Sequence, residues 1–285
     1  METMNNRKIF YRNHSRSTVE GAGVNLKRAF GFYNTEKTDP FLLLDDFRSD
    51  SPDDYIAGFP WHPHRGIETI TYMLEGKVEH GDSLGNSGVI DSGCVQWMTA
   101  GSGIIHQEMP KGDRKGRMGG FQLWANLPAK YKMTSPKYRD VRKADIPEVK
   151  LDNGVIIRII CGKINGIKGP VGDVVIEPEY LDVLMPAGQS FKHDIPDGHT
   201  VIAYIVNGEG HFGDGKTLKR GSLAIFSKEG EMAAFADKTS FRFLLVSGKP
   251  LNEPIAWGGP IVMNTREELR TAFKEYNNGT FIKKQ

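Results

Sequence analysis

The fold of this chain is decided by His62-Pro63-His64-Arg65-Gly66 and by Gly103-Ile104-Ile105-His106-Gln107-Glu108. Each motif places two metal-binding side chains one residue apart: His62 with His64, and His106 with Glu108. Because residues i and i+2 of a β-strand point to the same face, each pair can aim at one point. Two such strands side by side would surround that point with three imidazoles and one carboxylate. The motifs therefore predict a metal site.

A second carboxylate competes with Glu108 for the fourth position. Glu68 follows His64 by four residues and can share its face. It is therefore an alternative ligand, or a residue that hydrogen-bonds to a ligand histidine without binding the metal itself. Mixed nitrogen and oxygen ligands suit Fe, Mn, Ni, Cu or Zn and leave positions open for O2 or a substrate oxygen. The absence of thiolates from both motifs favours a catalytic rather than a structural site.

Short apolar runs separated by turn residues indicate an all-β fold. The chain contains 33 Gly and 15 Pro, which divide it into many brief segments typical of sandwiches and barrels. The predicted strands lie around 41–44, 69–74, 95–98, 120–125, 155–160, 174–176, 201–206, 223–226 and 241–246. The predicted turns include 50–54, 80–83, 85–88 and 91–93.

An internal repeat indicates two domains of one design. The segment Gly66–Gly76 matches Gly198–Gly208, with glycine at both ends and a tyrosine at the same place within each. A second block, Gly93–Met98, matches Gly221–Phe226. A tandem duplication explains both matches.

The repeat also tests the metal site. In the second copy, the four candidate ligands are replaced by Asp194, Pro196, Ala234 and Ala236. Losing all four together predicts one metal-binding barrel and one metal-free barrel.

The predicted organisation is an N-terminal metal-binding barrel over 1–130, a crossing over 131–150 and a C-terminal barrel over 151–285. The crossing is rich in charge and proline. A helix is expected over 264–276, because Thr265 and Glu268 have capping-box spacing and apolar residues recur on one face.

Composition excludes several classes of protein. A formal net charge of +2 gives no field suited to nucleic acid, and no DNA-reading motif is present, so direct nucleic-acid binding is not expected. No apolar run reaches the length of a membrane span. Cys94 and Cys161 make no disulfide framework. With no secretion signal at the start of the chain, these features predict a cytoplasmic protein.

The motifs resemble those of the pirin family, within the cupin superfamily of jelly-roll-like barrels. The matching segments are Asp39–Asp46, His62–Thr69, Gln96–Gly101, Gly103–Pro110, Gln122–Leu127 and Gly259–Thr265. The resemblance covers nearly the whole chain. It implies two tandem cupin barrels, with iron in the first and none in the second.

The resemblance also assigns roles. It implies metal ligation by His62, His64, His106 and Glu108, which favours Glu108 over Glu68. Some members of the family act as quercetin 2,3-dioxygenases, so the expected substrates are a flavonol and O2, with ring opening as the reaction. Glu108 would then be both a ligand and the candidate general base that accepts the flavonol hydroxyl proton. Members described as transcription or metabolic-enzyme co-regulators imply an alternative, a metal- or redox-dependent protein-binding regulator without turnover.

A flavonol site needs apolar walls, which the sequence offers in several places. The candidates are Phe59, Trp61, Met73, Trp97, Met98 and Ile104. Core packing explains most of them equally well, so no substrate contact is assigned.

Overall fold

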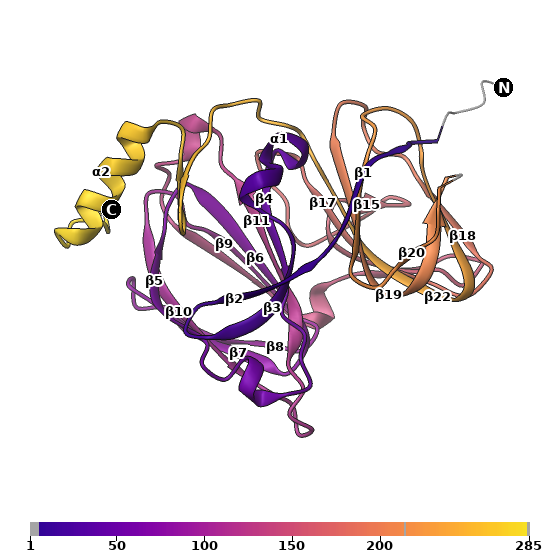
Figure 1. Cartoon of the computed structure of the whole chain (residues 1–285), viewed down its shortest axis with the longest axis horizontal. Coiled ribbons are helices and arrows are strands. Elements are labelled where there is room, and N and C mark those ends of the chain that lie inside the picture. The colour runs from indigo at the N-terminus through magenta and orange to yellow at the C-terminus, as the bar shows by residue number, and fades with distance from the viewer. Residues whose placement is uncertain (1–5, 214, 284–285) are drawn as a thin grey trace. The chain divides into compact units, whose positions relative to one another are not determined.

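The computed structural model describes residues 6–213 and 215–283, and strands dominate it, which confirms the all-β prediction. The described chain forms two compact units (Figure 1). We call them the N-terminal barrel, residues 16–34, 41–143 and 251–283, and the C-terminal barrel, residues 6–15, 35–40, 144–213 and 215–250.

These units differ from the predicted domains at both ends of the chain. Strand β1 (Ile9–His14) pairs with β21 (Ser222–Phe226) and belongs to the C-terminal barrel. Residues 251–283, including helix α2 (Arg266–Asn277), belong to the N-terminal barrel. Boundaries drawn at single points along the chain cannot represent this, because tertiary pairing returns each terminal segment to a barrel distant in sequence.

The N-terminal barrel is built from two facing sheets. One has the strand order β12-β9-β6-β11-β4-β3-β2, and the other has the order β5-β10-β7-β8. Their strands are β2 (Arg16–Glu20), β3 (Val24–Phe30), β4 (Phe41–Asp46), β5 (Phe59–His64), β6 (Ile67–Glu75), β7 (Lys77–Asp82), β8 (Ser87–Asp91), β9 (Val95–Thr99), β10 (Ile104–Lys111), β11 (Gly119–Asn126) and β12 (Lys137–Val141).

The second of these sheets carries both metal motifs. Strands β5 and β10 pair antiparallel, with His106 opposite His62, so the two motifs are neighbours as predicted. The register shifts between His106 and Glu108, which marks an irregularity in β5 at Pro60 and Trp61. Such irregularities re-aim side chains next to functional sites.

The predicted turn over 80–83 is wrong. His80, Gly81 and Asp82 end strand β7, which pairs with β10 on one side and β8 on the other. A polar His-Gly-Asp run is typical of a turn, but pairing on both sides satisfies its backbone as strand.

The C-terminal barrel has a continuous apolar interior. Its main sheet has the order β1-β21-β19-β22-β17-β14-β13, with β18 on β22 and β20 on β19. The remaining strands of the described chain are β13 (Glu148–Lys150), β14 (Ile156–Cys161), β15 (Lys163–Ile164), β16 (Ile167–Lys168), β17 (Glu179–Met185), β18 (Ser190–His193), β19 (Thr200–Phe212), β20 (Leu218–Lys219) and β22 (Met232–Gly248), and, in the N-terminal barrel, β23 (Ala256–Gly258) and β24 (Ile261–Met263).

Two details of the C-terminal barrel bear on the sequence predictions. Val174, Val175 and Ile176 form no strand, because Glu177 has a left-handed backbone (φ 46°) and Pro178 follows it. Ala234 and Ala236, at the positions that match His106 and Glu108, are buried in the apolar core.

The C-terminal helix begins as predicted. The Thr265 side chain accepts a hydrogen bond from the Glu268 backbone, and the Glu268 carboxylate accepts one from the Thr265 backbone, which completes the capping box. Short helices complete the described chain: η1 (Phe32–Asn34), α1 (Thr35–Thr38), η2 (Pro52–Asp54), η3 (Ala129–Tyr131) and η4 (Lys143–Asp145). No helix within residues 6–213 and 215–283 is long and apolar enough to cross a membrane.

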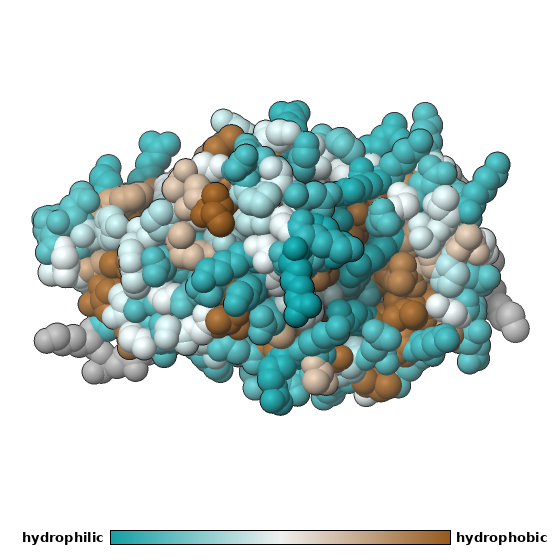
Figure 2. Space-filling view, turned by 90° about the horizontal axis from the view of Figure 1, so that it is seen from below, coloured by the Kyte–Doolittle hydropathy of each residue, from teal (hydrophilic) through white to brown (hydrophobic). Residues whose placement is uncertain are grey.

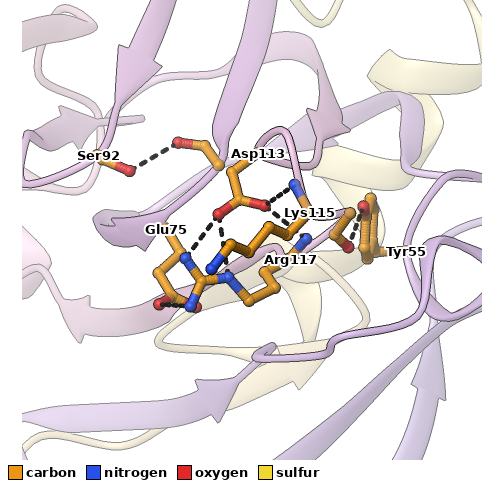
Figure 3. A network of polar contacts seen from close by, with 8 residues as sticks. Tyr55, Glu75, Ser92, Asp113, Lys115 and Arg117 are labelled. Carbon is orange, nitrogen blue, oxygen red and sulfur yellow. Dashed lines mark hydrogen bonds and ion pairs between the residues drawn. The ribbon is translucent and has the colours of Figure 1, made fainter.

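The charged connection between β10 and β11 is held by internal pairs (Figure 3). Asp113 accepts bonds from the Arg117 guanidinium (2.7 Å to Nη2) and from the backbone of Lys115 and Arg117. The Arg117 side chain also pairs with Glu75 at 3.1 Å. The backbone bond from Arg117, followed by its side chain, lowers the pKa of Asp113 to about 2. These bonds tie the two sides of the loop together around Asp113.

Apolar side chains are dispersed over the surface. On the face shown in Figure 2, small hydrophobic patches lie among hydrophilic ones. The more exposed large apolar residues include Tyr33 (94%), Val19 (65%), Ile56 (58%), Phe32 (55%) and Trp61 (52%). Single exposed apolar residues are ordinary, so a role for any of them needs a further contact.

Candidate metal centre and pocket

The N-terminal barrel brings three histidines together. Ligand nitrogens of His62, His64 and His106 all lie within 4.8 Å of one another. His64 and His106 are each 1% exposed, whereas His62 is half-buried and faces the opening. These histidines form a candidate metal site with one side open to a ligand.

Backbone carbonyls fix the ring orientation of two of the histidines. His62 Nδ1 lies 2.9 Å from the Pro60 carbonyl oxygen, and His64 Nδ1 lies 3.1 Å from that of Pro260. A carbonyl can only accept, so each Nδ1 carries the proton and each Nε2 presents a lone pair. The two Nε2 atoms face each other at 3.1 Å, which is the arrangement of two ligands to one cation.

His106 gives the clearest sign that a cation fits. Its ring is buried, and neither ring nitrogen has a hydrogen-bond partner among the described residues. Burial, together with the neighbouring histidines, keeps the pKa of His64 well below its usual value. Burial also lowers the pKa of His106 to about 4, although Glu108 opposes the shift. Both rings are therefore neutral at neutral pH, the form that binds a metal.

Glu108 lies beside this cluster and is held by its own partners. Gln122 Nε2 donates to its carboxylate at 3.1 Å, and Thr71 Oγ1 donates at 3.3 Å. The indole nitrogen of Trp124 donates to Gln122 Oε1 at 3.1 Å, which orients the amide with its nitrogen toward Glu108. Glu108, His62 and His64 line one pocket. The carboxylate is thus aimed into the space that the histidines face.

Glu68 lies in a different environment. It sits on β6 opposite Thr99 of β9, whose hydroxyl donates to it at 2.6 Å. Arg139 lies 3.9 Å away. Burial raises the pKa of Glu68, and Thr99 opposes the shift. Thr99 and Arg139 both stand on the seven-stranded sheet, not on the sheet of β5 and β10. The three-histidine cluster itself contains neither Glu68 nor Glu108, so the two carboxylates differ in their hydrogen-bond partners and in the pocket that Glu108 shares with His62 and His64.

Of the other histidines, His80 departs from expectation. It falls in the predicted turn over 80–83, where a side chain would face solvent, but it is 8% exposed, lies opposite Glu108 on the strand ladder and stacks on Tyr138. Gln96 Nε2 donates to its Nε2 at 2.9 Å. In the C-terminal barrel, His193 pairs with Glu179 and His211 with Asp237, which are ordinary structural contacts.

The candidate metal centre opens into a pocket of about 660 Å³ within the N-terminal barrel. This volume is typical of small-molecule sites. Aromatic side chains form its walls: Phe32, Phe59, Trp61, Trp124 and Trp257. The Trp124 ring meets His64 edge to face, with centroids 5.1 Å apart, and Trp257 lies 6.1 Å from Trp124. The pocket can therefore take a flat aromatic ligand next to the histidines.

One polar cluster interrupts the aromatic walls. Arg28 forms a bidentate pair with Asp45 (2.9 and 2.7 Å) and also meets Glu20 at 2.8 Å. Burial raises the pKa of Asp45 to about 6, and the Arg28 side chain opposes the shift. Because two carboxylates surround one guanidinium, this end of the pocket suits hydroxyl groups better than a carboxylate ligand.

Comparison with known proteins identifies the family to which the chain belongs. The Pirin family model matches residues 23–125, and the model of the Pirin C-terminal cupin domain matches residues 180–282. The chain belongs to the pirin family. It is 43% identical to a pirin-like protein of Caulobacter vibrioides, over 93% of this chain and 95% of the other. It is 46% identical to the Pseudomonas aeruginosa protein named "Putative quercetin 2,3-dioxygenase PA3240", over 91% and 93%.

Solved structures share the fold of this chain. The crystal structure of quercetin 2,3-dioxygenase from Acinetobacter baumannii matches with a TM-score of 0.90 and 35% identity, over 97% of this chain and 99% of the other. The predicted tandem cupin fold is thereby confirmed. A bacterial pirin from Escherichia coli, solved with nickel(II), shares the fold at 22% identity, with a TM-score of 0.65, over 84% of this chain and 99% of that one.

Sequence reasoning missed several residues of this pirin-family pocket. Of the apolar candidates, Phe59 and Trp61 line it, whereas Met73, Trp97, Met98 and Ile104 are at most 1% exposed and belong to the core. Trp124 and Gln122 stood in a motif that had been assigned no role. Pro260 stood in the matching segment Gly259–Thr265, which had also been assigned no role. Trp257 and Arg28 lay outside the matching segments.

Proposed function

We propose that this pirin-family chain is a metal-dependent dioxygenase of the quercetin 2,3-dioxygenase type, with iron bound by His62, His64, His106 and Glu108. The observation that carries the proposal is the buried His106 ring, which has no hydrogen-bond partner among the described residues and packs against His62 and His64. The Nε2 atoms of His62 and His64 face each other, and both residues line the aromatic pocket. The name of the Acinetobacter baumannii neighbour supports flavonol and O2 as the substrates.

In the proposed reaction the residues of the pocket have separate roles. A divalent metal at the histidines would supply a Lewis acid that lowers the pKa of a bound flavonol hydroxyl. Glu108 accepts the proton of that hydroxyl, and Gln122 with Thr71 keeps the carboxylate aimed at it. Trp124 and Trp257 contact the flat ring system and displace water from around it.

The proposal is tested by metal loading and turnover. The purified protein would be stripped and reloaded separately with Fe, Mn, Ni, Cu and Zn, and its metal content would be measured. Flavonol loss and O2 consumption would then be followed together for each form. Stoichiometric consumption by the iron form supports the proposal, whereas an iron-loaded protein that turns over none of several flavonols would exclude it.

Glu108→Gln is expected to lower turnover by about 10²–10⁴-fold, the usual contribution of a general base. The amide keeps the shape of the side chain but cannot take the proton. The matched control is Glu68→Gln, which changes a second buried carboxylate that pairs with Thr99 and does not line the pocket. Loss of metal and turnover in the Glu68 variant, with neither lost in the Glu108 variant, would reverse the assignment.

Trp257→Ala is expected to raise KM for a flavonol by about 2- to 12-fold, with kcat less affected. An aromatic pair contributes about 0.5–1.5 kcal/mol beyond its buried area, and this contact is made before and during the reaction. Phe10→Ala is the control, because Phe10 is an exposed aromatic residue of the C-terminal barrel and is absent from the pocket lining. Equal KM changes in both variants would argue against stacking on Trp257.

A second candidate is a metal-dependent protein-binding regulator without turnover. The observation that favours it is the exposure of Phe32 and Trp61, which line the pocket and also face solvent. The turnover experiment separates the two functions, because a regulator would bind metal and consume neither flavonol nor O2.

A further inference from the structure

The C-terminal segment 251–283, which we call the arm, lies directly beside the first metal motif. In Figure 1 its yellow end, with α2, lies beside the purple and magenta strands of the N-terminal barrel. Arg65 and Ile261 form a parallel bridge, and the Val262 amide donates to the Arg65 carbonyl at 3.0 Å. The arm therefore extends the barrel at the residue that follows His64.

The arm reaches the metal centre itself. The carbonyl that orients His64 belongs to Pro260, in the turn between β23 and β24, and the Nδ1–oxygen distance is 3.1 Å. Trp257, from the same segment, lines the pocket next to Trp124. One stretch of the arm thus sets the tautomer of a buried histidine and supplies a pocket wall.

Glycines in both metal motifs leave room for the arm. A Cβ on Gly66 would clash with the Val262 carbonyl oxygen, and a Cβ on Gly103 would lie 2.9 Å from the Phe281 ring. Both glycines also have positive φ, at 78° and 135°. The two motifs are therefore shaped for contact with this segment as well as for chain reversal.

A buried arginine fixes the far end of the arm. The Arg65 guanidinium pairs with Glu275 of α2 at 2.7 Å and donates to the Phe281 carbonyl at 2.8 Å. Its side chain is 2% exposed and lies over the Phe281 ring, 4.1 Å from the centroid. Because Arg65 adjoins His64, docking of α2 and placement of the ligand ring depend on one short piece of backbone.

We propose that the arm is a positioning element of the metal centre, so that docking of α2 through Arg65–Glu275 and metal binding at His64 stabilise each other. This inference rests on the proposed metal site. Outer partners that orient a metal-bound histidine change affinity by about 10–100-fold, and linkage requires the effect to be reciprocal. A metal that holds His64 in place should therefore also hold the arm.

The test uses the full-length protein and Ni²⁺ as an air-stable probe. Glu275→Gln is compared with Glu267→Gln, a change on the same helix whose carboxylate pairs with Arg270 and is 84% exposed. Ni²⁺ affinity is measured by competition with a chromophoric chelator. We expect about 10-fold weaker binding for Glu275→Gln and no change for Glu267→Gln. Arg65→Lys, which retains the charge but loses the fork that reaches Glu275 and Phe281, should weaken binding similarly.

Hydrogen exchange of α2 provides the second readout. Ni²⁺ should slow exchange of the helix amides in the wild type and in Glu267→Gln, and slow it less in Glu275→Gln. The inference would be overturned by an unchanged Ni²⁺ affinity in Glu275→Gln. It would also be overturned if Ni²⁺ left the hydrogen-exchange rates of the α2 amides unchanged, because the arm would then only cover the barrel. Coupling without flavonol turnover would instead remove the proposed enzyme activity and leave the inference standing. If the wild type binds no metal, both the proposed function and the inference about the arm are wrong.

Discussion

His106→Ala is expected to weaken metal binding by more than about 100-fold. Losing a residue that only hydrogen-bonds to a metal ligand costs about 10- to 100-fold, and losing the ligand itself should cost more. The imidazole of His106 is 1% exposed, and no hydrogen bond from the described residues occupies either nitrogen. Because neither nitrogen has a hydrogen-bond partner among the described residues, the ring contributes polar atoms to this site chiefly as a ligand. Metal content after loading and dialysis measures the loss directly.

Stability measurements on His106→Ala should show whether the residue is needed for metal binding or for folding. A metal present at 100 times its Kd stabilises the wild type by about 2.7 kcal/mol, and this increment should vanish in His106→Ala. The metal-free variant should retain most of the wild-type stability, because it loses a buried group whose polar atoms were unsatisfied. His14→Ala, at an exposed histidine of β1, is the control. Full metal occupancy in His106→Ala would contradict the site.

The convergence of the histidines could be predicted from sequence because it depends on local geometry. His-x-His and His-x-Glu fix which faces the side chains share, and antiparallel pairing of β5 with β10 then brings the two pairs together. The start of α2 could be predicted for the same reason, because Thr265 and Glu268 cap it within one turn. The spacing alone could not choose between Glu68 and Glu108, because each follows a candidate ligand histidine at a spacing that can share its face.

The features missed from sequence are those set by distant segments. His80 is buried because β10 and β8 flank its strand, which a polar run cannot reveal. The arm returns to the N-terminal barrel from the other end of the chain, so Pro260 and Trp257 carry no local mark of their roles. Gly66 did appear in the motif, but the reason for it, the Val262 carbonyl, is almost two hundred residues away.

Lys132→Met is expected to lower the free energy of unfolding at pH 7 by about 3–5 kcal/mol, the cost of removing one partner from a buried charged network. Lys132 is 1% exposed, and its Nζ donates to the Gly66 carbonyl (2.9 Å), Asn126 Oδ1 (2.7 Å) and the Val262 carbonyl (2.9 Å). Methionine fills the space but leaves these buried oxygens short of a donor. Urea unfolding measures the change, and Lys130→Met, at an exposed lysine, should stay within about 0.5 kcal/mol.

The pH dependence of that difference tests the charge state of Lys132. Burial lowers the pKa of Lys132 from 10.5 to about 7, and Glu253 and Glu268 oppose the shift. Between these values the unfolded chain holds a proton that the folded protein has released, so the free energy of unfolding rises with pH across this window. The stability of the wild type relative to Lys132→Met should therefore grow from pH 7 to pH 10, by at most about 4 kcal/mol. A difference that stays flat would mean that the three oxygens hold the ammonium charged in the folded protein.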